Sequence, residues 1–315
     1  TMRMLQEEQA AGLVHDRADI FSAGMGATVP DGHGTQFGFE VPTLKEGDDP
    51  DAFVAARFDE GSEFLKLVMD DFSVVGFELP TLTSAQVYAL VEAAHRRQKI
   101  AVIHARDAEG YLAATQAGVD GFAHGLSESR PEPPLLEAMA NHGPFVIPTL
   151  TTTEGTQGGP GGAAFAEDDV MEPKLDEREK TALKRIRFEN PLVKFDFSIA
   201  LDSVRAFHQN GTPILAGSDS PNPGTTPGAS LHRELELLVE AGLTPSEALK
   251  AATANPADAF GLVDRGRIAP GFRADLLLVE GNPISRITDT RRIAGIWKRG
   301  LRHDVDSPES QVKAD

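Results

Sequence analysis

The sequence contains no cysteine among its 315 residues. Disulfide bonds and thiolate chemistry are therefore excluded, and cysteine usage says nothing about the redox compartment. The chain also lacks any run of about 20 apolar residues, the length that a membrane-spanning helix needs, so no transmembrane helix is expected. The stretch that begins at Thr1 shows no signal-like pattern and is silent on whether a precursor carried one, so the compartment stays open.

Basic residues are scarce relative to acidic ones. Lysine and arginine total 30 against 48 aspartates and glutamates, which gives a net charge of -18 and an isoelectric point near 4.9. Proteins bind nucleic acid and anionic membrane surfaces through basic patches, so neither partner is expected. An apolar content of 40% over this length is enough for a sizeable core. We therefore expect one large domain with a smaller appendage.

Strand-like and helix-like segments alternate along the chain, which is typical of an α/β protein with a parallel sheet. The predicted strands cover residues 18–23, 64–68, 100–104, 121–124, 145–150, 214–219, 274–279 and 293–298. The predicted helices cover residues 83–98, 109–117, 134–141, 177–188, 197–210, 231–241 and 244–253. Ser84 and Thr244 are the expected helix caps, the second in a capping box with Glu247. Residues 151–169 and 220–229 are expected to be loops, because the first is rich in Thr, Gly and acidic residues and the second in Pro and Gly.

Three of the predicted strands end in side chains that can bind a metal. His104 and His124 close two neighbouring strands, and Asp219 ends a third. In a parallel α/β barrel, side chains at the C-terminal ends of the strands meet at one mouth. Two imidazoles and a carboxylate brought together there can hold a divalent metal with open positions for water. The leading hypothesis is a metal-assisted hydrolase, in which Asp219 binds the metal or carries a proton from water to the leaving group.

Each of these residues also has an ordinary explanation. A lone histidine at the end of an apolar strand is more often structural than a ligand, and a short acidic residue after a strand commonly caps a loop. Lys66 lies inside an apolar run, where a lysine can snorkel or pair with a carboxylate. It can also be carbamylated by carbon dioxide, so that its anionic end bridges two metals, and burial would favour the neutral amine that reacts.

Three further residues are candidates for substrate contact. His33 follows a predicted strand and lies between two glycines, His232 opens the helix after the Asp219 loop, and Arg106 lies two residues after His104. Histidines in such positions are usually ordinary surface residues. The argument for substrate contact is that these residues are near the presumed site. The glycine-rich run at residues 158–162 lacks a following Lys-Ser/Thr and a strand–loop–helix context, so a nucleotide-binding role is rejected.

At these residues the chain resembles the imidazolonepropionase-like and prolidase-like branch of the amidohydrolase superfamily. The runs that carry the resemblance are FLKL at 64–67, IPTL at 147–150, GSD at 217–219, LHRELEL at 231–237, AGLTPSEAL at 241–249, ATANPA at 252–257 and GRIAPGFRADL at 266–276. This combination is specific and extends over nearly the whole chain. It implies a TIM-like (β/α)8 barrel with a small β-sandwich domain. Residues 1–262 would belong to the barrel, 263–303 to the C-terminal part of the small domain, and 304–315 to a loose tail.

The resemblance also implies an activity. Members of this branch hydrolyse dipeptides, cyclic amides and N-acyl amino acids with one or two divalent metals, often zinc. By position, Lys66 would be the carbamylated bridge of a binuclear centre, and His104 and His124 would be ligands from the fifth and sixth strands. Asp219 would be the carboxylate of the eighth strand. The resemblance thus predicts cleavage of a small amide by metal-activated water, in a protein that forms oligomers as many members do.

One departure from the family pattern is serious. The family carries a His-x-His pair at the end of the first barrel strand, and this chain contains no such pair. The sequence corresponds to the barrel from about the third strand onward, without the first two strands. We therefore expect the pair to come from a second polypeptide or from a missing N-terminal segment. Two alternatives stay open: an esterase, lactonase or organophosphate hydrolase on the same site, and a non-catalytic binding or structural barrel fragment.

Overall fold

The computed structural model describes residues 2–14, 17–73, 78–186 and 196–303. The helices are α1 (Met2–Ala10), α2 (Pro50–Asp59), α3 (Ser84–His95), α4 (Ala108–Gln116), α5 (Pro133–His142), α6 (Leu150–Thr156), α7 (Gly161–Ala166), α8 (Glu177–Lys184), α9 (Phe197–Gln209), α10 (Ala229–Glu240), α11 (Pro245–Ala251) and α12 (Ala254–Ala259), with short 3-10 helices η1 (Thr35–Phe37), η3 (Glu172–Lys174) and η4 (Ile287–Arg291). The strands are β1 (Leu65–Val68), β2 (Ala101–His104), β3 (Gly121–Ala123), β4 (Phe145–Ile147), β5 (Leu276–Val279), β6 (Ile293–Lys298) and β7 (Leu301–His303). Within these residues no helix is long and apolar enough to cross a membrane.

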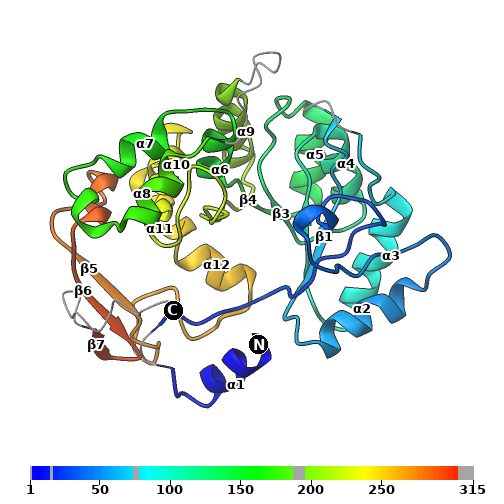
Figure 1. The fold of residues 1–315 in the computed structure, drawn as a ribbon, viewed down its shortest axis with the longest axis horizontal. Coiled ribbons are helices and arrows are strands. Elements are labelled where there is room, and N and C mark those ends of the chain that lie inside the picture. Colours follow the sequence, from blue (N-terminus) through cyan, green and yellow to red (C-terminus); the bar gives the residue numbers. More distant parts are fainter. Residues whose placement is uncertain (1, 15–16, 74–77, 187–195, 304–315) are drawn as a thin grey trace.

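A parallel sheet of order β1-β2-β3-β4 organises the larger part of the molecule (Figure 1). Parallel bridges extend it at both ends, from Ala27 to Leu67 and from Val146 to Ile214. This arrangement confirms the predicted α/β class with a parallel sheet. In the described part of the chain no backbone pairing joins the two ends of this arc. Barrel closure and the absence of two strands therefore remain predictions.

Helices lie on the outside of the sheet, as βαβ connections require (Figure 1). Strand β2 is buried at every position, in keeping with a short apolar run enclosed on both faces. Helix α3 directs Val87, Leu90 and Val91 into the same core. Its cap is Thr83, in a capping box with Gln86, so the expectation of a Ser84 cap was wrong by one residue. The predicted capping box of Thr244 and Glu247 at the start of α11 is confirmed.

Three predicted segments differ from the structure. Residues 18–23 form no strand, and the strand predicted at 214–219 is reduced to the single bridge at Ile214. Residues 151–169, expected to be a loop, contain most of α6 and all of α7. The first turn of α6 is held from a distance, because the buried carboxylate of Glu234 on α10 accepts hydrogen bonds from the backbone of Leu150 and Thr151. A tertiary contact thus overrides the weak helix propensity of a Thr- and Gly-rich segment.

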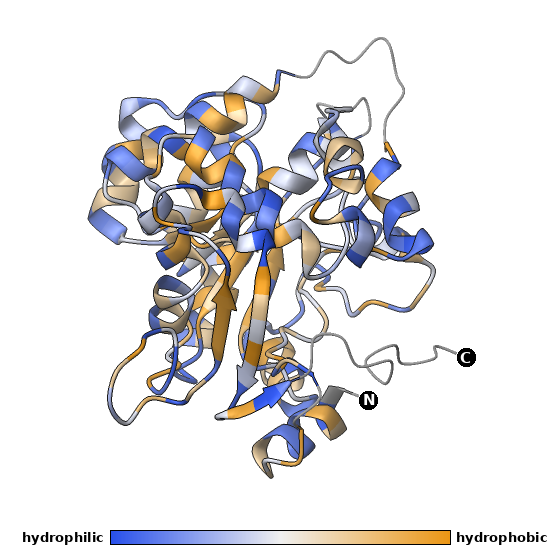
Figure 2. Ribbon diagram, turned by 90° about the vertical axis from the view of Figure 1, so that its left-hand side faces the viewer, coloured by the Kyte–Doolittle hydropathy of each residue, from blue (hydrophilic) through white to orange (hydrophobic). Residues whose placement is uncertain are grey.

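The C-terminal part of the described chain forms a separate antiparallel sheet of order β5-β6-β7. Figure 2 shows β5 as hydrophobic along its whole length. Leu277 and Leu278 of this strand are each 53% exposed. The carboxylate of Asp19 connects the N-terminal region to this sheet through an ion pair with Lys298 of β6. The proposed division at residue 262 stays a prediction, and the tail predicted at 304–315 lies outside the described residues.

Candidate active site

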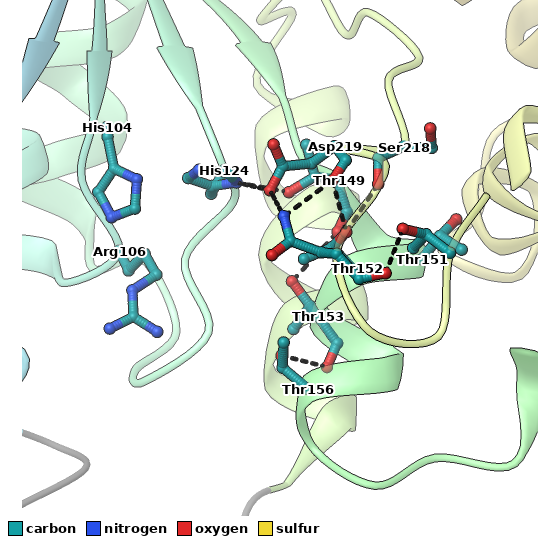
Figure 3. Close-up of polar contacts among 12 residues, drawn as sticks. His104, Arg106, His124, Thr149, Thr151, Thr152, Thr153, Thr156, Ser218 and Asp219 are labelled. Atoms are coloured by element: carbon teal, nitrogen blue, oxygen red, sulfur yellow. Dashed lines mark hydrogen bonds and ion pairs between the residues drawn. The ribbon is translucent and has the colours of Figure 1, made fainter. Parts of the chain in front are cut away.

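Side chains from neighbouring strand ends converge at one edge of the parallel sheet (Figure 3). His104 is the last residue of β2 and His124 directly follows β3, and their ring centroids are 4.5 Å apart. Asp219 follows the segment that pairs through Ile214, and its Oδ2 lies 3.9 Å from Nδ1 of His124. Lys66 comes from β1, where it is close enough to Asp219 for the two charges to interact. The four residues predicted as a metal site thus lie together.

Register and backbone conformation explain how the two histidines meet. The ladder pairs Val68 with His104 and His104 with Ala123, so these three residues share a level and a face of the sheet. Strict alternation would turn His124 to the opposite face. Its φ of 81° departs from the extended conformation and brings the ring back towards His104. Asp219, with φ 54°, also adopts this unfavourable left-handed conformation. Such strained residues are concentrated at functional sites.

Asp70, two residues beyond the end of β1, is the buried partner of His104. One of its oxygens, Oδ2, lies 2.7 Å from Nε2 of His104 and 2.6 Å from Nε of Arg106. Burial alone would raise the pKa of Asp70, but hydrogen bonds to His104 and Arg106 outweigh it and hold the pKa well below its usual range. Asp70 is therefore a carboxylate at neutral pH. As an acceptor, it requires the proton of His104 to be on Nε2.

Both histidines of the pair are neutral at pH 7. Burial lowers the pKa of His104 to about 4, and Asp70 only partly offsets this effect. Burial, together with the neighbouring His104 and Lys66, holds the pKa of His124 well below its usual value. Because Nε2–H of His104 donates its hydrogen bond to Asp70, the Nδ1 atom of the neutral ring carries a lone pair. A neutral imidazole oriented by a carboxylate is the usual form of a histidine metal ligand.

Lys66 has the properties that the carbamylation hypothesis needs. Its side chain is partly buried, and burial lowers the pKa of the amine to about 8, while Asp219 acts in the opposite direction. At pH 7 the amine of Lys66 is therefore neutral in about a tenth of the molecules, and only the neutral amine can react with carbon dioxide.

A threonine at the end of β4 holds the second histidine. Thr149 is buried, adopts φ 49°, and places Oγ1 2.7 Å from Nδ1 of His124. Glu234 fixes the helix that follows, because its Oε2 accepts from both the backbone N and the Oγ1 of Thr151 at 2.8 Å. Burial raises the pKa of Glu234 to about 7, although these hydrogen bonds lower it. Thr149, Glu234 and Asp70 were all missed from the sequence. Asp70 follows the predicted strand 64–68 and Thr149 lies near the end of the predicted strand 145–150, so the strand-end argument could have found both.

The structure brings two of the three predicted substrate-contact residues to this cluster. The ring of His33 lies 5.0 Å from that of His104 and 4.4 Å from that of Phe72. Arg106 stacks its guanidinium 4.7 Å over Phe72. His232 is placed elsewhere, on α10 against η4, where its Nδ1 lies 3.0 Å from Oγ1 of Thr290. His232 is therefore near Asp219 in the sequence but does not join the cluster in the structure.

The donor atoms of this cluster match part of what a divalent metal needs. Two neutral imidazoles, a carboxylate and a lysine that can become a carbamate are chemically suitable ligands. In the described ranges, however, no group of three or more His, Cys, Asp or Glu side chains is arranged to hold an ion. The chain thus contributes suitable donors without a complete coordination sphere.

The profile of the amidohydrolase family matches residues 23–302. The chain belongs to the amidohydrolase family. It is 33% identical over 171 residues to the imidazolonepropionase of Cereibacter sphaeroides, a match that covers 51% of this chain and 42% of that protein. The ochratoxinase of Aspergillus niger is 27% identical over 221 residues, covering 68% of this chain and 40% of the relative. The matches thus span less than half the length of these two curated relatives.

A solved structure of a putative prolidase from Bifidobacterium longum has the same fold, with a TM-score of 0.73 and 25% identity. The match covers 96% of this chain and 70% of that one. These findings confirm the imidazolonepropionase-like and prolidase-like branch of the amidohydrolases. They also support a TIM-like arrangement for the parallel arc of this family member.

Asp70 can be tested through stability. Changing Asp70 to Asn removes the buried carboxylate that accepts from His104 and Arg106 and leaves Arg106 with only the more distant Glu128, at 3.9 Å, so we expect the free energy of unfolding to fall by about 2 kcal/mol. The adjacent Asp71 is exposed, and Asp71→Asn should change stability by less than about 0.5 kcal/mol. Urea denaturation measures both. Equal effects of the two substitutions would contradict the role given to Asp70.

His232 gives a prediction for pH. Burial, with help from Arg291 and Lys174, lowers its pKa to about 4, below the value of about 6.5 in an unfolded chain. The unfolded state therefore binds more protons between these pH values, and stability falls as pH falls through this window. From pH 7 to 4.5, His232→Gln should lose about 2 kcal/mol less than the wild type. Urea denaturation at both pH values tests this.

The exposed His142 provides the matched control. His142→Gln should follow the wild-type pH dependence, since Glu234 and the other titrating groups are common to all three proteins and cancel in the comparison. A parallel pH profile for His232→Gln would show that burial of His232 has no cost for its protonation.

Proposed function

We propose that this chain supplies catalytic residues of a metal-dependent hydrolase that cleaves an amide bond in a small substrate, such as a dipeptide, an N-acyl amino acid or a cyclic amide. The main support is the approach of Asp219 to His124, at 3.9 Å, beside the His104–His124 pair. A carboxylate next to two neutral imidazoles and a lysine of lowered pKa is suited to metal-assisted hydrolysis. Family membership supports the same reaction class.

In this proposal His104, His124, Asp219 and the carbamate of Lys66 would hold one or two divalent ions, with zinc the first choice. When bound, such an ion would polarise the scissile carbonyl and lower the pKa of water. Asp70 keeps Nδ1 of His104 available by accepting the hydrogen bond from Nε2–H, which fixes the proton on Nε2. The hydroxyl of Thr149 orients the ring of His124. Asp70 and Thr149 thus hold the two rings in place while both imidazoles stay neutral.

Asp219 moves the proton. Its side chain is 38% exposed, so water and substrate can reach it, and Asn222 Nδ2 donates to Oδ2 at 2.7 Å. The carboxylate accepts the proton of the attacking water and passes it to the leaving nitrogen, which would otherwise depart as an unstable anion. His33, whose ring lies 5.0 Å from that of His104, and Arg106, which shares Asp70 with His104, border this cluster, and we assign them to substrate contact.

We propose further that a His-x-His pair from polypeptide outside this chain completes the ligand set. The described residues contain no group of three ready ligands, which is consistent with an external contribution. The exposed leucines of β5 are a second sign, because adjacent exposed apolar side chains often mark a surface that another polypeptide segment covers. The small sheet at 263–303 would then be one part of a larger domain.

The proton-shuttle role predicts the effect of one isosteric change. Asp219→Asn removes the base and should lower kcat by a factor of about 100 to 10,000, without loss of folded protein. Asp258, an exposed carboxylate on α12, is the control, and Asp258→Asn should retain wild-type rates. A panel of N-acyl amino acids, dipeptides and cyclic amides, with matched esters, serves as substrates. Unchanged turnover by Asp219→Asn would sink this assignment.

The metal site predicts a second loss. Mass spectrometry of the protein as isolated, with every co-purifying polypeptide identified, should find one or two zinc-like ions. Removal by a chelator should abolish hydrolysis, and zinc should restore it. Lys66→Met should lower metal content and activity together, whereas Lys250→Met at an exposed position should leave both unchanged. Full metal content in Lys66→Met would exclude Lys66 as a ligand.

A further inference from the structure

Helix α6 begins without a cap from its own N-terminal residue. The first N–H groups of a helix have no partner inside the helix, and a threonine in the preceding position often accepts from one of them through its hydroxyl. Thr149 occupies this position but makes no such bond. Its Oγ1 is instead 2.7 Å from Nδ1 of His124, a candidate metal ligand. The side chain that would cap the helix is thus used to hold the site.

A carboxylate from another helix takes over the capping. Glu234 lies on α10 and is wholly buried. Its Oε1 accepts from the backbone N of Leu150 at 3.0 Å, and its Oε2 accepts from the backbone N and the hydroxyl of Thr151 at 2.8 Å each. These two N–H groups are among those that a helix leaves unpaired. Glu234 therefore satisfies the start of α6 and leaves Thr149 available for His124.

The start of α6 also holds the segment that carries Asp219. Thr152 donates its hydroxyl hydrogen to the carbonyl oxygen of Ser218 at 2.7 Å (Figure 3). About one turn later, a Cβ on Gly155 would lie 2.5 Å from the carbonyl oxygen of Pro223, so the helix packs directly on the loop that follows Asp219. The position of α6 therefore helps to fix the backbone on both sides of this carboxylate.

Three threonines of this turn act as one unit, here called the threonine clamp and defined as Thr149, Thr151 and Thr152. All three are buried. Each hydroxyl has a different partner: a candidate ligand, the remote cap and the backbone before Asp219. Threonine has a low helix propensity, so the turn gains its stability from these bonds rather than from its composition. A change at Glu234 should therefore be felt on both sides of the site.

We infer that Glu234 is a positioning residue, which sets the approach of His124 to Asp219 through the threonine clamp. This inference rests on the proposed function, because it takes these two side chains as parts of the reaction centre. Their Nδ1 and Oδ2 atoms are 3.9 Å apart, and both residues have positive φ values that only the surrounding structure can maintain. Glu234 itself is buried away from any substrate, so its effect is expected in kcat rather than in KM.

Glu234→Gln tests the cap without changing its size, since the amide nitrogen of glutamine cannot accept a hydrogen bond. We expect kcat on the best amide of the panel to fall roughly tenfold to hundredfold, as small displacements of catalytic groups do, and KM to change less than about threefold. Glu240→Gln, at an exposed position of the same helix, should keep both constants. Assays at about pH 8.5 keep the wild-type Glu234 ionised, because burial raises its pKa to about 7.

A double-variant cycle separates positioning from a general loosening of the fold. Thr149→Val removes the bond to His124 and leaves the cap in place. If Glu234 acts through this threonine, Glu234→Gln/Thr149→Val should be at most about threefold slower than the slower single variant. Independent effects would multiply, and multiplied losses would contradict the inference. Thr151→Val, which removes only one hydroxyl from the cap, replaces Glu234→Gln in every comparison if that variant does not fold.

The ring of His124 gives a readout that needs no turnover. Heteronuclear NMR of the protein as isolated, with His124→Gln to assign the signal, should show Nδ1 shifted in the same direction by Glu234→Gln and Thr149→Val, and unshifted by Glu240→Gln. An unshifted signal in the folded cap variant would overturn the inference, whatever its rate. The expected shifts without hydrolysis by any protein would refute the proposed function and leave the positioning of His124 by Glu234 in place.

Discussion

The in-step register of the parallel strands is the constraint on which the candidate site depends. Val68, His104 and Ala123 lie at one level, and Lys66 lies two residues below Val68 on the same face. A slip of one residue in any of these pairings would turn the side chains of that strand to the opposite face. The register is held by residues that alternate with the site residues and point to the opposite face of the sheet, such as the buried Leu65 and Ile103. The packing of one face of the sheet and the geometry of the site on the other face therefore depend on the same strand register.

Buried charge imposes the next requirement. Arg106, at two residues past the strand end, would be costly near two neutral imidazoles without a counterion, and Asp70 supplies it through the same oxygen that binds His104. One carboxylate thereby neutralises the guanidinium and sets the tautomer of the histidine. The pKa of His104 is low because burial, together with the neighbouring Lys66 and His33, disfavours the charged ring more than Asp70 favours it. Burial and the neighbouring charges thus keep His104 neutral at pH 7, which is the form that can bind a metal.

Sequence patterns predicted the parallel α/β organisation and most helices, because apolar periodicity and caps are local signals. The capping box at Thr244 and the strand ends at His104 and His124 are of this kind. Helix α6 was missed since its first turn depends on Glu234, more than 80 residues later in the chain. The prediction for His232 was misled because it is near Asp219 in the sequence, whereas in the structure its ring lies against Thr290 of η4 and not at the strand-end cluster. Long-range partners decide both cases, and no local pattern contains them.

The site divides its tasks between two kinds of backbone. Side chains proposed to act on the amide come from strand ends, whose positions the sheet fixes, with His124 and Asp219 in strained conformations that only a rigid surrounding can maintain. His33, which we assign to substrate contact, comes from a glycine-bounded turn that is anchored by its own hydrogen bonds, such as Thr35 Oγ1 to the carbonyl of Gly32. Substitutions at the tip of that turn leave the strand register untouched. A fold built in this way can change the group it recognises next to the scissile bond while the residues that would cleave the bond stay in place.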